Sequence, residues 1–107
     1  MRLDIKPLSV NKAWKGKRFK TNDYKFYEIA VLKILPSFSV PEGRLKLSLT
    51  FGFSSKASDT DNPVKCFQDI LSKKYDFDDK RIYHIEAKKV NVKKGQEFIE
   101  WQLEAIA

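Results

Sequence analysis

The stretch from 45 to 53, LKLSLTFGF, alternates strictly between large apolar residues and residues that are polar or small. Side chains two positions apart on a strand point to the same face of the sheet. The alternation therefore predicts a strand that buries one face and leaves the other polar. It is the most regular pattern in the chain.

Two segments with helical spacing of apolar residues flank this strand. In the first, Thr21 or Asn22 can act as N-cap, and Pro36 ends the helix. In the second, Asn62 and Pro63 suit the N-cap and the first helical position. The apolar faces expected are Tyr27, Ala30, Val31, Ile34 and Leu35 for the first helix, and Val64, Phe67, Ile70 and Leu71 for the second.

Three further strands are predicted, in segments 1–8, 81–92 and 97–106. Lys93, Lys94 and Gly95 suggest a hairpin turn that joins the last two. The apolar residues expected to share a face are Tyr83, Ile85 and Ala87 in one of these strands, and Ile99, Trp101 and Leu103 in the other.

The element order is therefore β-α-β-α-β-β, which predicts an α+β fold with two helices packed on one mixed sheet. A chain of 107 residues matches a single domain over 1–107 with one core. The longest apolar run, 29–35, contains Lys33, so neither a membrane span nor a signal peptide is expected. Cys66 is the single cysteine, which excludes an intrachain disulfide and agrees with a reducing cytoplasm.

The chain is strongly basic, with a formal net charge of +7. A basic surplus on a small domain points to an acidic partner, and nucleic acid is the first candidate. A lysine-rich surface that serves only solubility is the alternative. The small core also leaves a thin margin of stability, which a homodimer can increase by burying more area.

The positive charge is densest just before the first helix, where Gly16 permits a hairpin tip. Contacts from such a loop to backbone phosphates position DNA without reading its sequence. Trp14 or Phe19 can stack on an unpaired base, although a place in the core or a dimer interface is favoured for Trp14. The residues expected to contact DNA are Asn11, Lys12, Lys15, Lys17, Arg18 and Lys20.

Acidic residues gather in two tight pairs, Asp59 with Asp61 and Asp78 with Asp79. Neighbouring carboxylates repel, which raises a pKa or recruits a cation. Mg²⁺ takes oxygen ligands and uses few protein carboxylates, so it suits such a site. If the two flanking strands are adjacent, both pairs meet at one end of the sheet, as a metal-dependent phosphodiesterase requires. Lys65 lies one helical turn beyond Asp61 and can face the same site.

A structural interpretation of the acidic residues stands beside the catalytic one. Aspartates before a helix often serve only as caps and turn residues. Lys65 can likewise be an ordinary solvent-facing lysine. His84 has no His or Cys neighbour and is expected to be structural, and Cys66 to be inert packing. No zinc cluster, glycine-rich phosphate loop or nucleophilic triad is recognisable, so no small-molecule cofactor is expected.

Four segments together resemble the RusA family of Holliday junction resolvases, which are common in phages and prophages. "PLSVNKAWKGKRFKT" is similar to the family's P-x-S-x-N segment and basic loop, and "DTDNPVKCFQDIL" to its D-x-D-N-x-x-K helix start. "YDFDDKRI" is similar to its D-D turn, and "KKVNVKKGQEFIEWQLE" to its closing hairpin. The resemblance covers nearly the whole chain, and its specificity lies in the order of the four segments.

The resemblance implies an endonuclease that depends on Mg²⁺ or Mn²⁺ and acts as a homodimer, making paired nicks in four-way DNA junctions. Asp59, Asp61 and Asp79 would bind the metal, with Asp78 beside them, and Lys65 would contact the phosphate or a water. It would act in the cytoplasm of a bacterial host, as a phage or prophage protein.

One position departs from the family pattern, because many members carry an arginine where this chain has Ser58. This difference puts a DNA contact in doubt and leaves the carboxylates untouched. Two other functions stay open. The chain can be a metal-dependent nuclease for flaps or nicked duplex, or a non-catalytic basic module that binds branched DNA.

Overall fold

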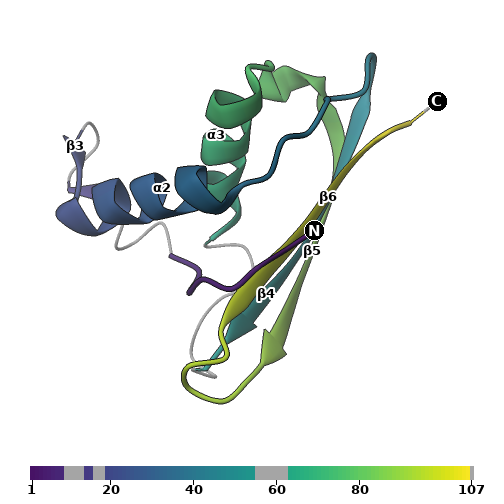
Figure 1. The fold of residues 1–107 in the computed structure, drawn as a ribbon. Helices are drawn as coiled ribbons and strands as arrows, with labels where there is room; N and C mark the ends of the chain where they lie inside the picture. Colours follow the sequence, from purple (N-terminus) through teal and green to yellow (C-terminus); the bar gives the residue numbers. More distant parts are fainter. Residues whose placement is uncertain (9–13, 16–18, 55–62, 107) are drawn as a thin grey trace.

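The computed structural model describes residues 1–8, 14–15, 19–54 and 63–106. The predicted α+β fold is confirmed: a mixed four-stranded sheet carries both long helices on the same side (Figure 1). In chain order the elements are β1 (Arg2–Leu3), β2 (Trp14–Lys15), β3 (Phe19–Lys20), α2 (Asn22–Ile34), β4 (Leu45–Phe53), α3 (Val64–Tyr75), the 3₁₀ helix η1 (Asp79–Arg81), β5 (Ile82–Asn91) and β6 (Phe98–Ala105).

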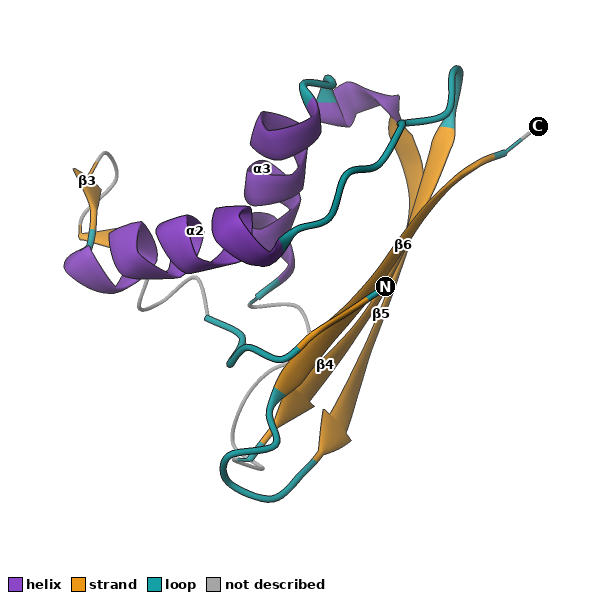
Figure 2. Cartoon of the chain, viewed as in Figure 1, coloured by secondary structure: helices purple, strands orange, loops and turns teal. Residues whose placement is uncertain are grey.

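The strand with the strictest alternation, β4, lies inside the sheet. The strand order is β1-β6-β4-β5, so β4 pairs with β5 on one side and with β6 on the other. Its pairing with β5 is parallel and its pairing with β6 is antiparallel. The β4–α3–β5 segment is therefore a parallel crossover, with α3 over the sheet, as Figure 2 shows.

The predicted hairpin between the last two strands is wrong, because β4 lies between β5 and β6. The turn signals do form a turn, since the Gln96 amide donates to the Lys93 carbonyl at 2.9 Å and Gly95 has a φ of 92°. That turn belongs to a wider connection, which must span two strand spacings, about 10 Å. Glu97 braces it by accepting hydrogen bonds from the Gly95 amide and the Ser54 hydroxyl.

The core lies between the sheet and the two helices. All five apolar side chains of the β4 alternation are buried, as are Ile99, Trp101 and Leu103 of β6. These residues confirm the predicted core faces of both strands. The α3 side chains buried against them are Cys66, Phe67, Ile70 and Leu71.

Helix α2 begins and ends where its sequence predicts. The Thr21 hydroxyl accepts a hydrogen bond from the Tyr24 amide at 3.2 Å, and the helix ends at Ile34, two residues before Pro36. Its buried face differs from the prediction, because Ile34 is 45% exposed while Tyr24 is buried. The buried stripe runs through Tyr24, Tyr27 and Val31 and continues at Leu35, while Ile34, the last helical residue, stays outside the core.

Helix α3 ends one residue later than expected, at Tyr75. Asp76 follows in the left-handed conformation, with φ 51° and ψ 60°, and its amide donates to the Ser72 carbonyl. The predicted N-cap, Asn62, lies outside the described residues. Pro63 precedes the first helical residue and makes no side-chain capping bond.

Two strands deviate from their predicted patterns. β1 covers only Arg2–Leu3, because the Ile5 amide donates back to the Leu3 carbonyl and turns the chain. In β5, the register shifts after the Leu45–Ile82 pair, so Tyr83 falls in a bulge and is 65% exposed. Tyr83 therefore does not share a face with Ile85 and Ala87, as the alternation had predicted.

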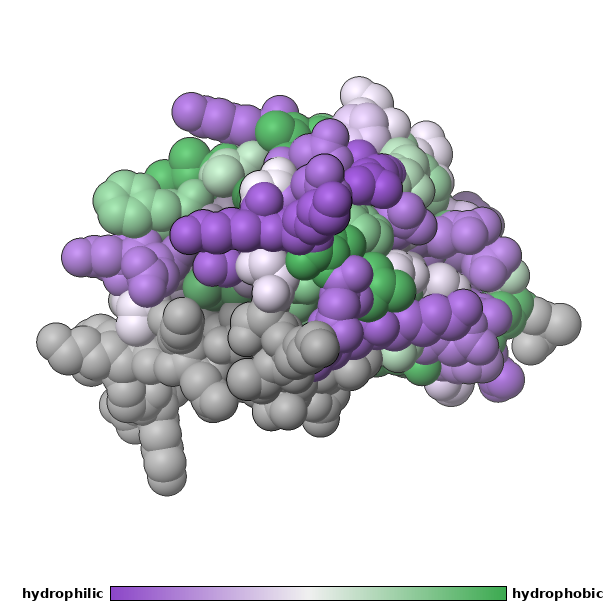
Figure 3. Space-filling view, turned by 90° about the horizontal axis from the view of Figure 1, so that it is seen from below, coloured by the Kyte–Doolittle hydropathy of each residue, from purple (hydrophilic) through white to green (hydrophobic). Residues whose placement is uncertain are grey.

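On the face seen in Figure 3, hydrophilic side chains cover much of the described part, with apolar groups visible between them. One apolar contact lies on the sheet face away from the helices. The Phe98 ring packs directly over Gly52, its register partner on β4, and the Arg2 guanidinium lies 4.1 Å from the ring centroid. Among the described residues, no helix is long and apolar enough to cross a membrane.

Replacing Gly52 with valine should destabilise the protein by about 1–3 kcal/mol, because a Cβ at this position collides with the Phe98 ring. Urea unfolding followed by circular dichroism measures the change. Ser48→Val on the same strand is the matched control, and it should have a much smaller effect. Combining Gly52→Val with Phe98→Ala should cost less than the sum of the two single changes. An additive double variant would contradict the proposed collision.

Candidate active site

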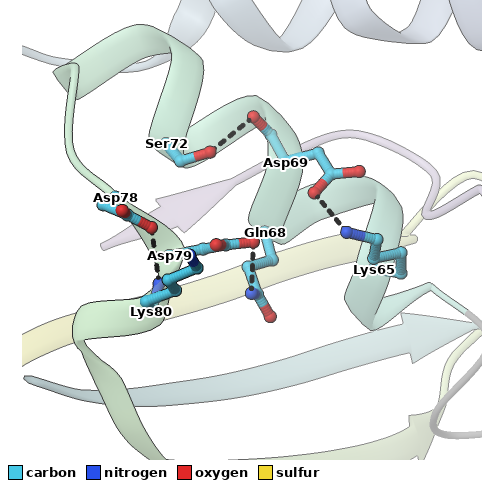
Figure 4. A network of polar contacts seen from close by, with 7 residues as sticks. All are labelled: Lys65, Gln68, Asp69, Ser72, Asp78, Asp79 and Lys80. Atoms are coloured by element: carbon cyan, nitrogen blue, oxygen red, sulfur yellow. Dashed lines mark hydrogen bonds and ion pairs between the residues drawn. The ribbon is translucent and has the colours of Figure 1, made fainter.

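A cluster of charged and amide side chains lies where α3 meets η1. Lys65, Gln68 and Asp69 project from α3, and Asp79 approaches them from η1 (Figure 4). The two elements are consecutive in the chain, joined by the turn through Asp76. The parallel crossover therefore places residues 65–69 beside residue 79.

Lys65 is held by a residue on its own helix. Its Nζ lies 2.9 Å from Asp69 Oδ1, one turn further along α3. The hydrogen bond to Asp69 is the main reason that the pKa of Lys65 is raised. The negative charges of Asp69 and Asp79 raise this pKa further, while partial burial lowers it. The raised pKa keeps Lys65 positively charged, and the negative charges of both carboxylates act on it.

Asp79 and Asp78 have different surroundings although they are adjacent. Asp79 is half-buried, and its Oδ2 accepts a weak hydrogen bond from the side-chain amide of Gln68, Nε2, at 3.5 Å. Asp78 is exposed and caps η1, since its Oδ1 accepts from the Lys80 amide at 2.9 Å. The capping bond gives Asp78 a role in local structure. The carboxylate of Asp79 is instead directed toward α3.

The position of η1 is fixed from its far end. Arg81 Nε donates to the Gly43 carbonyl at 3.1 Å, and its Nη2 donates to the Pro41 carbonyl. Both carbonyls belong to the loop that leads into β4. Arg81 thus ties the segment carrying Asp79 to the start of the central strand.

The position of α3 is fixed by two contacts with preceding elements. Lys73 Nζ lies 2.7 Å from Glu28 Oε1 on α2. The Tyr75 hydroxyl donates to the Pro36 carbonyl at 2.6 Å. With the buried apolar face of α3, these contacts hold the helix that supplies Lys65 and Asp69.

The structure locates only part of the predicted site. Lys65 and Asp79 lie close enough for their charges to interact. Asp59 and Asp61 lie outside the described residues, as do Asn11, Lys12, Lys17 and Arg18. Lys15 and Lys20 lie in a short hairpin formed by β2 and β3, immediately before α2. This pairing agrees with the hairpin expected around Gly16.

The metal expectation can be tested only on the acids that the structure describes. Asp79 supplies carboxylate oxygens, which suit Mg²⁺ or Mn²⁺. Within residues 1–8, 14–15, 19–54 and 63–106, no three acidic, His or Cys side chains converge as a metal site. A complete site at Asp79 would therefore require Asp59, Asp61 or both.

Two members of the cluster, Gln68 and Asp69, are not among the residues predicted from the sequence. The spacing of Lys65 and Asp69 is i, i+4, which is a standard ion-pair spacing on a helix and was a usable signal. Gln68 had no such signal, because its partner Asp79 is eleven residues away and the contact depends on the turn through Asp76.

The two residues expected to be structural have different surroundings. Cys66 is fully buried in the core, and burial, the main cause, raises the pKa of its thiol to about 11. His84 lies on β5 with its Nε2 3.9 Å from Glu86 Oε1, away from the α3–η1 cluster. Neither belongs to the candidate site.

Comparison with known proteins identifies no relative: no family model and no curated protein matches this sequence.

The Cys66 thiol should react slowly in the native protein. With its pKa raised to about 11, the thiolate fraction at pH 8 falls by about 100-fold from that of an ordinary cysteine. The rate of reaction with a disulfide reagent at pH 8, measured before and after urea unfolding, checks this. Lys74→Cys in a Cys66→Ala background is the exposed control on the same helix. Equal rates for the two native proteins would contradict the burial of Cys66.

Proposed function

We propose that this protein is a Mg²⁺- or Mn²⁺-dependent endodeoxyribonuclease that resolves four-way DNA junctions by paired nicks. The observation that carries the proposal is the cluster at α3 and η1, in which Lys65 pairs with Asp69 and the charge of the half-buried Asp79 also acts on Lys65. The resemblance of four ordered segments to the RusA family supports the choice of substrate.

The cluster supplies two of the groups that phosphodiester cleavage would use. A lysine ammonium can bind a nonbridging phosphate oxygen, and a carboxylate can bind a metal. Asp69 holds Lys65 in position, and Gln68 donates to Asp79. Both supporting residues lie on α3, so the geometry depends on one helix and its crossover.

The predicted carboxylates Asp59 and Asp61 are close to this cluster in the sequence. Asp61 lies four residues before Lys65, so the chain between them can extend by no more than about 14 Å. Residues 59 and 61 together with Asp79 would supply the oxygen ligands. A metal bound there would activate water and neutralise charge on the attacked phosphate.

The basic surplus supports delivery of DNA to an acidic site. With a net charge of +7, the protein attracts a polyanion that the local carboxylates would otherwise repel. The β2–β3 hairpin, whose strands contain Lys15 and Lys20, directly precedes α2. We assign phosphate contacts to this hairpin, and these contacts make binding dependent on salt.

Asp61→Asn should abolish cleavage and leave junction binding largely intact, because it removes a metal ligand and not a phosphate contact. The measurement uses a labelled synthetic four-way junction with Mg²⁺, with Mn²⁺ and with EDTA. A gel shift in EDTA measures binding in parallel. Symmetric nicks that require metal and disappear in the variant are the expected result.

Two outcomes would overturn the assignment. Full cleavage by pure Asp61→Asn protein would remove Asp61 from the site. Tight binding without cleavage in either metal would make the wild-type protein a non-catalytic module for branched DNA. Nicked and flapped duplexes, assayed alongside, test whether the junction is the preferred substrate.

Asp69→Asn should lower kcat for junction cleavage by about 10- to 100-fold and leave KM nearly unchanged, because it frees Lys65 without removing it. Steady-state kinetics on the junction, with substrate in excess, measure the two constants. Lys74→Gln, an exposed change on the same helix, is the control and should keep full activity. An unchanged kcat in Asp69→Asn would show that Lys65 needs no support from Asp69.

A further inference from the structure

The outer edge of β5 is the longest open strand edge among the described residues. β5 has ten residues and is the last strand of the sheet, whereas the opposite edge strand, β1, has two. None of its residues is buried. A long edge of unpaired backbone groups is a template for pairing with another strand.

The side chains along this edge are unusually apolar for an exposed strand. Tyr83, Ile85 and Val90 are 65%, 43% and 40% exposed. Lysines, which commonly protect strand edges from pairing, occur here as Lys88 and Lys89. However, Glu86 lies two residues before Lys88, so the edge carries both signs of charge on the same face.

We propose that two copies of this chain pair through β5 in antiparallel orientation, with Ala87 opposite Ala87 of the second copy. In this register Glu86 of each copy lies opposite Lys88 of the other, which gives two cross-strand ion pairs. Ile85 lies opposite Lys89, whose methylene stem can cover it.

The charges select this register over its neighbours. Moving the two-fold axis to residue 86 places Glu86 opposite Glu86, and moving it to residue 88 places Lys88 opposite Lys88. Like charges directly opposite each other are destabilising. The sequence of β5 is thus self-complementary in the register centred on Ala87.

The symmetry of this pairing has a consequence for the proposed nuclease. An antiparallel edge pairing places the two-fold axis perpendicular to the sheet, so both helix layers lie on the same face of an eight-stranded sheet. Residue 82, where η1 joins β5, is then separated from its copy by ten strand residues, about 33 Å. The dimer would present two Asp79 clusters on one face, as paired nicks require. Only this last point rests on the proposed function.

Engineered cysteines test the register directly. Cα atoms directly opposite in an antiparallel pair are about 4.5–5.5 Å apart, which suits a disulfide. Ala87→Cys should therefore form a covalent dimer under mild oxidation. Lys89→Cys is the matched control: its copies lie about 13 Å apart in this register and should not cross-link. Wild-type protein controls for the buried Cys66.

Charge reversal tests the same register by equilibrium. Sedimentation without DNA or metal should show a dimer for wild type, and Glu86→Lys or Lys88→Glu should weaken it by about tenfold. The double reversal should restore the dimer. Glu86 also lies 3.6 Å from Lys46 within its own chain, a pair that the double reversal does not restore. Restoration therefore reports the contact between copies.

A second exposed apolar surface provides the competing interface. Phe26 and Ile29 on α2 are 71% and 52% exposed. Phe26→Glu should leave the dimer intact if β5 is the interface. A protein that is monomeric at all concentrations, a dimer that only Phe26→Glu disrupts, or cross-linking by Lys89→Cys instead of Ala87→Cys would each overturn the proposal. None of these results depends on cleavage, so the nuclease assay tests the function separately.

Discussion

The burial of β4 between two neighbouring strands and under two helices is the constraint on which the rest of the structure depends. Its large apolar side chains form the floor of the core, and its backbone pairs along its whole length with β5 and β6. Because β4 and β5 are parallel neighbours, the chain must cross over the sheet after Phe53. That crossover is α3, and the candidate site lies at its junction with η1.

The candidate site is therefore a product of topology and of a few anchoring contacts. Arg81 ties η1 to the loop before β4, and Lys73 ties α3 to α2. Between these anchors, Lys65 pairs with Asp69 on α3, and Gln68 of the same helix donates to Asp79 of η1. The ion-paired lysine on α3 and the half-buried carboxylate on η1 are the charged groups on which the proposal of phosphate chemistry is built.

The proposed nuclease and the proposed dimer are related through the same strand. β5 follows η1 directly, so an interface on β5 fixes the distance between two copies of the cluster. The open edge of the sheet and the helix layer then have separate roles. The sheet edge would join the subunits, and the face that carries α3 would meet the DNA. The lysine-rich hairpin directly precedes α2 in the chain and would extend the surface that meets the DNA.

The sequence by itself determined the elements and much of the core. Strand β4, the cap at Thr21 and the buried faces of β6 and α3 follow from local periodicity and capping, which depend on residues a few positions apart. It also indicated Lys65 and Asp79 as neighbours of one site. Only the tertiary structure decided that β4 separates β5 from β6, that Tyr83 falls in a bulge and that Ile34 leaves the core. It also supplied Gln68 as the partner of Asp79. These features depend on which distant segments compete for the same strand edge or core volume, and that competition is settled by packing between elements rather than within them.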